Sequence, residues 1–352
     1  MQPIGLSRRT LLMLAALAGP AAWALPPRTL QFPRDFGSHP DLRTEWWYIT
    51  GHARSGAREF GFQLTFFRSR IDATQTMNSA FAAKQLIFAH AAITDLEGRK
   101  LWHDQRIARA GFGIASAAES DTDVRLRDWS LQRDANAYVA RLPASGFSID
   151  LRFTPTQSVL LQGNAGLSRK GPEPEQASYY YSEPQLAATG SLTVQGKRFD
   201  VQGRAWLDHE WSEAILHPEA IGWDWIGMNL FDGGALTAFR LRRRDGSALW
   251  HGGSLRTADG RLQVFGPDAL RFEAEHSWTS PRTRAIYPTR WRIHTPAGIF
   301  TVQSLLDDQE LDGQGSTGTV YWEGLSDLLD AEGKPVGRGY LELTGYAQPL
   351  KL

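Results

Sequence analysis

An internal repeat constrains the fold of this chain more than any other feature. Four motifs of the first half recur in the same order in the second half, and the separation between matched motifs shrinks steadily along the chain. The pairs are Trp46-Trp47-Tyr48 with Trp223-Asp224-Trp225, His90-Ala91-Ala92 with His251-Gly252-Gly253, Tyr181-Ser182-Glu183 with Tyr321-Trp322-Glu323, and Gly196-Lys197 with Gly333-Lys334. Four ordered matches indicate duplication of one unit. We therefore expect two domains that superimpose with Trp46 on Trp223 and His90 on His251.

The local pattern indicates strands. Apolar and polar residues alternate in short runs such as 61–68 and 190–196, and turn signals such as Asp245-Gly246 and Asp259-Gly260 separate the runs. Alternation with this turn spacing is typical of antiparallel sheets closed into barrels or sandwiches. The predicted fold class is all-β, with two antiparallel β-barrel domains and few, short helices.

The repeat also sets the domain boundaries. The prediction is an export signal over residues 1–24, an N-terminal domain over 25–213 and a C-terminal domain over 214–352. No Gly/Ser-rich or charged linker lies between the copies, so the domains should pack closely. A cleft between packed domains is a common place for a ligand.

The first residues predict export. Arg8-Arg9 precede an apolar run that reaches Ala18, and Ala22-Trp23-Ala24 forms a small-residue cleavage pattern. This is typical of a twin-arginine signal peptide, and the alternative is a general secretory signal with two arginines. Either route predicts a periplasmic protein. The apolar run is too short to span a bilayer, and no later segment reaches the roughly 20 apolar residues that a membrane helix needs.

Composition excludes several classes. The chain has no cysteine, so it has neither disulfides nor thiolate chemistry. Its 38 basic residues equal its 38 acidic ones, and loss of the signal peptide would leave a small negative charge. That balance does not indicate the excess of positive charge that is typical of proteins that bind nucleic acid or an anionic membrane. The 13 tryptophans must instead line packed interiors or a pocket for an apolar or flat molecule.

Candidate catalytic residues lie where the two copies differ. The first copy ends in Trp206-Leu207-Asp208-His209-Glu210-Trp211, whereas its counterpart reads Leu343-Thr344-Gly345-Tyr346. We predict catalytic roles for Asp208, His209 and Asp224. A carboxyl held among indoles is poorly solvated, so its pKa rises and it can donate a proton near neutral pH. Indole faces can stabilise a carbocation, and an imidazole can activate water.

The predicted substrate-binding residues surround this segment in the sequence. They are Glu45, Trp46, Trp47, Tyr48, Trp211, Trp223 and Trp225. The alternative for these aromatic residues is an ordinary place in a barrel core. For His209 and Asp208 the alternative is a hydrogen-bonded strand end.

Other chemistries have less support. Gly313-Gln314-Gly315-Ser316-Thr317-Gly318 lacks the first glycine of a nucleophile elbow, and His209-Glu210 is not followed by a histidine at zinc-protease spacing. His52, His90, His209 and His251 could gather round a metal ion, but nothing in their spacing favours such a site. We therefore expect no metal and no cofactor.

The motifs Glu45-Trp46-Trp47-Tyr48-Ile49-Thr50-Gly51-His52, Trp206-Leu207-Asp208-His209-Glu210-Trp211 and Gly222-Trp223-Asp224-Trp225 resemble the AttH/CrtC-like family. This family includes predicted secreted hydrolases and relatives of the carotenoid 1,2-hydratases. The resemblance covers almost the whole chain and implies two lipocalin-like domains. It also implies a His-x-Trp pair, matched by His209 and Trp211, and a nearby aromatic/Asp pair, matched loosely by Trp223 and Asp224.

The resulting hypothesis is an exported protein that binds a hydrophobic, isoprenoid or lipid-like molecule between two barrels. As an enzyme it would be a hydratase. Asp224 or Asp208 would protonate an alkene, Trp211 and Trp225 would stabilise the cation, and His209 would deliver water. The alternatives are a non-catalytic lipophile carrier that serves an envelope transport system, and a hydrolase of esters, which has the least support.

Overall fold

The computed structural model describes residues 24–350 of the chain. The predicted signal peptide therefore lies outside the described residues, except for Ala24. Within the described part, no helix is long and apolar enough to cross a membrane. Two short 3-10 helices, η1 (Arg34–Phe36) and η2 (Asp72–Thr74), accompany an otherwise all-β chain, as predicted.

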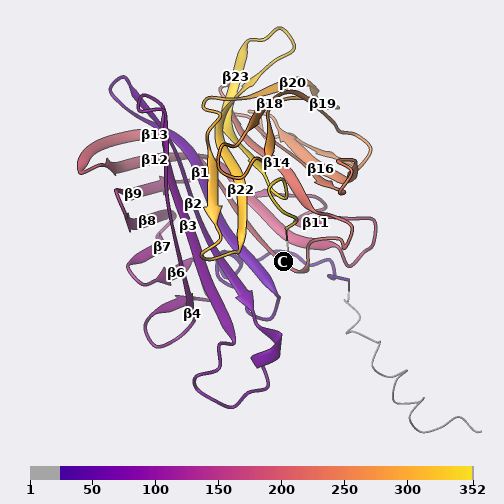
Figure 1. The fold of residues 1–352 in the computed structure, drawn as a ribbon. Coiled ribbons are helices and arrows are strands. Elements are labelled where there is room, and N and C mark those ends of the chain that lie inside the picture. The colour runs from indigo at the N-terminus through magenta and orange to yellow at the C-terminus, as the bar shows by residue number, and fades with distance from the viewer. Residues whose placement is uncertain (1–23, 351–352) are drawn as a thin grey trace, which may run out of the picture.

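The first half of the chain forms one antiparallel sheet (Figure 1). Its strands follow the order β4-β3-β2-β1-β13-β12-β9-β8-β7-β6-β5, and β10 and β11 pair with β12. Their bounds are β1 (Thr44–Ser55), β2 (Arg58–Arg70), β3 (Gln85–Asp95), β4 (Lys100–Arg109), β5 (Ala115–Ala117), β6 (Asp123–Leu126), β7 (Trp129–Asp134), β8 (Ala137–Ala144), β9 (Phe147–Thr154), β10 (Leu160–Leu161), β11 (Leu167–Arg169), β12 (Ala177–Val194) and β13 (Lys197–Ala214).

The second half forms a second antiparallel sheet. Its order is β17-β16-β15-β14-β23-β22-β20-β19-β18, and β21 pairs with β22. The bounds are β14 (Gly222–Leu230), β15 (Ala235–Arg242), β16 (Ala248–Arg256), β17 (Leu262–Phe265), β18 (Arg271–Thr279), β19 (Ile286–Thr295), β20 (Gly298–Ser304), β21 (Glu310–Gly313), β22 (Thr319–Leu329) and β23 (Pro335–Leu343).

The two sheets share one strand order, as the internal repeat predicts. In each sheet the first strand of the copy pairs with both the second strand and the last strand, so β1 corresponds to β14 and β13 to β23. Trp46 and Trp223 occupy matching positions on matching faces of β1 and β14.

The predicted match of His90 with His251 is wrong by one residue. Across the first sheet, Tyr48 pairs with Thr65 and Thr65 pairs with His90. Across the second sheet, Trp225, the counterpart of Tyr48, pairs with Phe239, and Phe239 pairs with Gly252. The counterpart of His90 is therefore Gly252. A one-residue slip moves a side chain to the other face of a sheet. His251 accordingly packs inside the second sheet, beside Phe272.

The first sheet curls into a nearly closed barrel, since β5 and β6 at one end of the path contact β3 and β4 at the other. Strand β9 shows the underlying pattern, because every second residue from Phe147 to Phe153 is buried. One apolar core fills this barrel and a second lies inside the second sheet. A third core, which includes Tyr48, Trp225 and Leu325, lies between the two sheets.

Candidate functional site

A cavity of about 400 Å³ lies between the two sheets. The outward faces of β1, β2, β3, β12 and β13 form one wall, and those of β14, β15, β22 and β23 form the other. These strands are buried on both faces, because one face covers a core and the other covers the opposite sheet. The predicted cleft between the two halves is therefore present.

Aromatic rings from both sheets meet across this cavity. Trp46 and Trp223 are nearly parallel, with ring centroids 6.5 Å apart and an angle of 19° between the planes. Tyr48 meets Trp225 edge to face at 5.4 Å. Because these residues occupy equivalent positions in the two copies, the duplicated fold has built a pseudo-symmetric aromatic lining.

Asp208 is a buried carboxyl in this lining. Its Oδ1 accepts hydrogen bonds from Ser182 Oγ at 2.5 Å and Trp206 Nε1 at 2.7 Å, and its Oδ2 accepts one from the Tyr180 hydroxyl at 2.8 Å. Burial raises the pKa of Asp208 to about 7, although these three donors act to lower it. This carboxyl can therefore change protonation state near neutral pH.

The second copy places its own carboxyl at the equivalent position. Tyr48 lies opposite Asp208, and Trp225, the counterpart of Tyr48, lies opposite Glu342. Burial raises the pKa of Glu342 to about 7, with a further contribution from the charge of Asp208. Sequence matching had paired the Asp208 strand end with residues 343–346 and so missed this counterpart.

Glu323 adds a third carboxyl where the first copy has Ser182. It lies directly opposite Glu342 in the pairing of β22 with β23. Burial raises the pKa of Glu323 well above its usual range, the neighbouring Glu342 adds to the rise, and the Tyr48 hydroxyl offsets part of it. Two carboxyls this close cannot both ionise easily, so the pair holds a proton near neutral pH.

Two polar atoms in this part of the cavity lack a well-formed hydrogen bond. Among the described residues, neither Glu323 Oε1 nor the Tyr48 hydroxyl has a partner of good geometry, although Glu323 is 2% exposed and Tyr48 6%. Buried polar atoms are nearly always satisfied in folded proteins. The two groups interact with each other without ideal geometry, and both lie on the cavity wall, so a ligand or water in the cavity can complete their hydrogen bonding.

Lys170 provides the buried positive charge of the cavity wall. Its Nζ pairs with Glu210 Oε1 at 2.9 Å and lies 4.6 Å from the ring centroid of Tyr180 and 4.3 Å from that of Phe239. Because Glu210 already neutralises it, the ammonium group does not leave an unbalanced charge in the site.

A histidine and a serine also meet at the edge of the cavity. His90 Nε2 lies 2.7 Å from Ser316 Oγ, and His90 Nδ1 lies 2.6 Å from the Tyr321 hydroxyl. Gln105 fixes the donor and acceptor at each step of this series of hydrogen bonds. Its Nε2 donates to the carbonyl of Asp312, so its Oε1 must accept the hydrogen bond from Ser316.

This order of donors and acceptors argues against a serine nucleophile. The single hydroxyl proton of Ser316 goes to Gln105, so His90 Nε2 must donate to Ser316 and His90 Nδ1 must accept from Tyr321. A histidine that donates to a serine is not positioned to act as its general base. Burial also lowers the pKa of His90 to about 3, so it is neutral.

The structure divides the ten predicted site residues into two groups. Five of them line the cavity between the sheets, namely Trp46, Tyr48, Asp208, Trp223 and Trp225. The other five face the barrel interiors, namely Glu45, Trp47, His209, Trp211 and Asp224. Successive side chains of a strand point to opposite faces, and the predicted set had combined neighbours in sequence.

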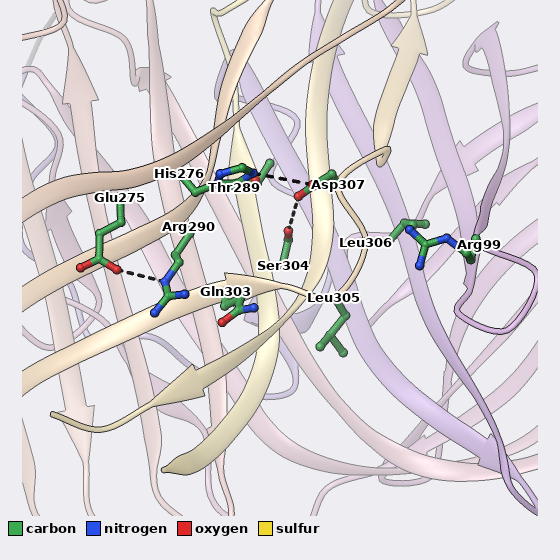
Figure 2. Close-up of a pocket in the computed structure, with 10 residues that line it drawn as sticks. All are labelled: Arg99, Glu275, His276, Thr289, Arg290, Gln303, Ser304, Leu305, Leu306 and Asp307. Carbon is green, nitrogen blue, oxygen red and sulfur yellow. Dashed lines mark hydrogen bonds and ion pairs between the residues drawn. The ribbon is translucent and has the colours of Figure 1, made fainter. Parts of the chain in front are cut away.

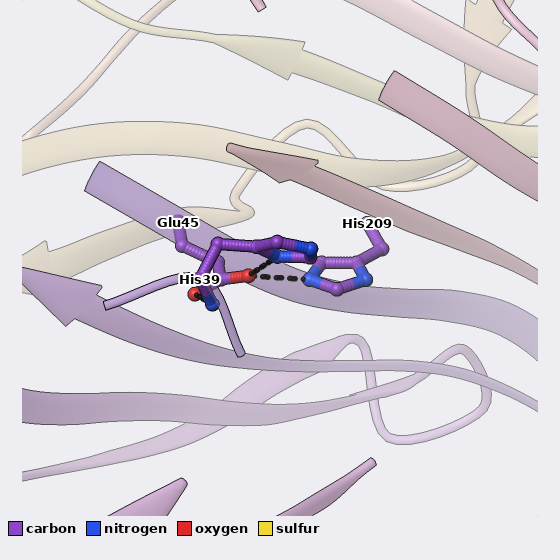
Figure 3. A group of neighbouring side chains, drawn as sticks. All are labelled: His39, Glu45 and His209. Atoms are coloured by element: carbon purple, nitrogen blue, oxygen red, sulfur yellow. Dashed lines mark hydrogen bonds and ion pairs between the residues drawn. The ribbon is translucent and has the colours of Figure 1, made fainter. Parts of the chain in front are cut away.

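His209 lies inside the first barrel in a closed polar cluster (Figure 3). Its Nε2 and the Nδ1 of His39 lie 2.9 and 2.7 Å from Glu45 Oε1. Burial acts to raise the pKa of Glu45, but the two histidines outweigh it and hold that pKa well below its usual range. Burial lowers the pKa of His209 to about 4, although Glu45 acts to raise it.

Further partners complete this cluster. Arg68 Nε donates to Glu45 Oε2 at 2.7 Å, and the Tyr181 hydroxyl lies 3.0 Å from His209 Nδ1. Trp211 stacks on His39 with a centroid distance of 3.9 Å. The ligand atoms of His39, Glu45 and His209 lie within 4.8 Å of one another, so their types and spacing suit a metal ion. The adjacent Arg68 guanidinium opposes a further positive charge there.

Asp224 lies inside the second sheet. Arg240 Nε contacts its Oδ2 at 2.5 Å, and Arg242 Nε and the Tyr346 hydroxyl contact its Oδ1 at 3.1 and 2.8 Å. Both carboxyl oxygens are therefore occupied by donors. The structure places neither Asp224 nor His209 on the cavity that holds Asp208.

A second hollow, of about 390 Å³, lies on the outside of the second sheet next to the turn that carries Arg99 (Figure 2). Ion pairs such as Arg290 with Glu275 line it, and it has no Phe, Tyr or Trp side chain. It lacks the buried carboxyl and aromatic pairing of the cavity between the sheets.

Comparison with known proteins agrees with this architecture. The sequence model of the AttH-like family matches residues 23–346. A crystal structure of a Nitrosomonas europaea protein assigned to AttH superimposes with a TM-score of 0.86 at 46% identity, covering 92% of this chain and 99% of that one.

Hydratases are more distant relatives. Kievitone hydratase of Fusarium solani subsp. phaseoli is 24% identical over 248 residues, which is 67% of each chain. The crystal structure of kievitone hydratase from Nectria haematococca has a TM-score of 0.71 at 16% identity and covers 91% of this chain and 94% of that one. The family model spans nearly the whole described chain, and this protein belongs to the AttH-like family.

Proposed function

We propose that this protein is a hydratase that binds an apolar, isoprenoid or lipid-like alkene between the two sheets and adds water to it by acid catalysis. The observation that carries the proposal is Glu323, a buried carboxyl with a raised pKa and an oxygen that lacks a well-formed hydrogen bond, on the wall of an aromatic cavity. The similarity to kievitone hydratase supports the reaction class.

The cavity residues suit the steps of such a hydration. Glu323 gives its proton to one alkene carbon, and the π electrons form the new C–H bond. The positive charge left on the other carbon faces the Trp225 and Trp223 rings, which stabilise a cation through their π systems. Water then adds to that carbon and releases its second proton to the Asp208 carboxylate.

Glu342 can close the proton cycle. It lies opposite Glu323, and its pKa responds to the charge of Asp208. In this scheme the proton gained by Asp208 returns to Glu323 by way of Glu342 and water in the cavity, and the net change is one water added to the alkene. This scheme keeps the predicted role of Asp208 and gives the roles predicted for Asp224 and His209 to residues that face the cavity.

The experiment incubates the purified protein with a panel of prenylated phenols and linear terpenoids in ¹⁸O-labelled water, with mass spectrometry of the products. A hydratase incorporates one labelled oxygen per turnover. Glu323→Gln should lower turnover by roughly 10²–10⁴-fold, the range for loss of a general acid.

Glu183→Gln is the matched control. Glu183 is also buried with a raised pKa, but it accepts a hydrogen bond from Tyr138 inside the first barrel. Its loss should leave turnover within a few-fold of the unaltered protein. Equal loss in both variants would refute the role of Glu323. If the protein retained the alkenes tightly but formed no labelled product, the result would favour the alternative of a non-catalytic lipophile carrier.

A further inference from the structure

Four large apolar side chains are exposed together at one end of the first sheet. Met77 and Phe81 belong to the loop between β2 and β3, and Phe112 and Ile114 belong to the turn between β4 and β5; we call these four residues the apolar tip. Phe81 is 75% exposed, Phe112 58% and Met77 50%. In Figure 1 the violet loop between β2 and β3 extends past the strand ends at the bottom of the view.

The apolar tip is ordered by contacts between its two segments. The Phe81 and Phe112 rings stack with centroids 5.7 Å apart and an angle of 14° between their planes. Arg109 joins them, because its guanidinium lies 4.0 Å from the Phe112 centroid and its Nη1 donates to the Phe81 carbonyl at 2.8 Å. The exposed rings are thus held in a defined arrangement at the surface.

The apolar tip lies beside strands and a loop that also line the cavity between the sheets. Ile71, at the base of the same loop, and Leu86, at the start of β3, line that cavity. Ile107, near the end of β4, is 37% exposed and also lines it. The apolar lining of the cavity therefore reaches the base of the segments that carry the apolar tip.

The charge around the apolar tip is basic, although the whole chain is balanced. The two segments that carry the apolar tip, residues 73–84 and 109–114, contain Lys84 and Arg109 and no Asp or Glu. Asp72, at the base of the loop, is paired with Arg70. Cationic groups beside exposed aromatic and aliphatic side chains are typical of segments that bind the interface of an anionic bilayer.

We propose that the apolar tip inserts into the interfacial region of a phospholipid bilayer, so that an apolar ligand passes from the lipid to the cavity. A tip of four side chains is far smaller than the roughly 800 Å² per partner of a stable protein–protein interface. Insertion of a few rings beside basic groups suits a reversible bilayer contact. This binding is independent of turnover in the cavity.

The experiment uses the absence of cysteine in the chain. Ala80→Cys in the loop is labelled with an environment-sensitive nitrobenzoxadiazole probe and mixed with vesicles of phosphatidylethanolamine and phosphatidylglycerol. Insertion predicts a several-fold rise in emission with a blue shift. The same probe on Ala331→Cys, in the exposed turn between β22 and β23, should not change.

Partition between vesicles and solution gives the second measurement. Phe81→Ser with Phe112→Ser should reduce binding by about tenfold or more, since two rings lose their burial in lipid. Phe231→Ser removes a ring that is 61% exposed in the turn after β14 and should change binding little. Unchanged probe emission at Ala80→Cys, or equal binding of the double variant, would overturn the proposal.

Discussion

At the scale of single residues, Glu342 ties stability to pH. Its pKa is raised to about 7 in the folded protein, so between its ordinary pKa of 4.5 and pH 7 the folded state holds a proton that the unfolded state releases. The contribution of this group is therefore most favourable at low pH and is lost as the pH rises through 7. The slope approaches about 1.4 kcal/mol per pH unit for one proton.

Glu342→Gln should remove that contribution. The free energy of unfolding of the variant, relative to the unaltered protein, should rise between about pH 5 and pH 8, as measured by urea denaturation. The buried His90 and His209, whose lowered pKa values favour folding at higher pH, are present in both proteins and cancel in the difference. If the stabilities of Glu342→Gln and the unaltered protein changed with pH in the same way, the prediction would be contradicted. Glu332→Gln, at an exposed position, is the control and should show the same pH dependence as the unaltered protein.

At the scale of elements, β1 performs two tasks on its two faces. Trp47 is fully buried in the first barrel and donates through Nε1 to the Phe36 carbonyl at 3.1 Å. Trp46, one residue earlier, lines the cavity between the sheets. The strand alternation therefore separates a residue that stabilises the barrel from one that contacts a ligand.

The two tryptophans form a matched pair of variants. Trp47→Ala should lower the free energy of unfolding by about 3–5 kcal/mol, the usual cost of emptying a large core site. Trp46→Ala should cost clearly less stability but should weaken retention of an apolar ligand, because its ring faces Trp223 across the cavity. Denaturation and ligand titration on both variants measure the two effects. Equal losses of stability would show that the faces are not distinct.

The same two-faced strands explain what the sequence could and could not predict. Local alternation was sufficient to predict the all-β class, and the ordered repeat was sufficient to predict that the two halves share one strand order. In β1 the consecutive residues Trp46-Trp47-Tyr48-Ile49 show no alternation, since both faces of the strand are buried, and the sequence does not show which face is the site. His209 and Asp208 were grouped for this reason, although they lie on opposite faces of β13.

Glu323 and Glu342 escaped prediction for another physical reason. Both stand at outward positions of strands, where a charged residue ordinarily faces water, so their sequence context is unremarkable. Only the packing of one sheet on the other removes them from solvent and raises their pKa values. The raised pKa values of these two carboxyls thus depend on the packing of the two sheets, and no local sequence pattern indicates them.

At the scale of the whole molecule, the cavity exists only while the two sheets are packed together. Core residues between the sheets include Trp206 from the first copy and Leu325 and Tyr340 from the second. The hydrogen bonds that join His90 of the first sheet to Tyr321 and Ser316 of the second half also connect the two copies. Because both copies contribute to this core between the sheets, we expect the protein to unfold in one cooperative transition.

Gly61 tests this coupling, because it lies on β2 directly against the second sheet. A Cβ at this position would lie 2.6 Å from the Tyr340 hydroxyl and 3.0 Å from Leu325 Cβ. Gly61→Leu should therefore wedge the sheets apart, lower the melting temperature, broaden or split the calorimetric transition, and weaken ligand retention. Gly266→Leu is the control, since a Cβ there would meet nothing within 4 Å. A single sharp transition with full ligand retention in Gly61→Leu would show that the sheets fold and bind independently.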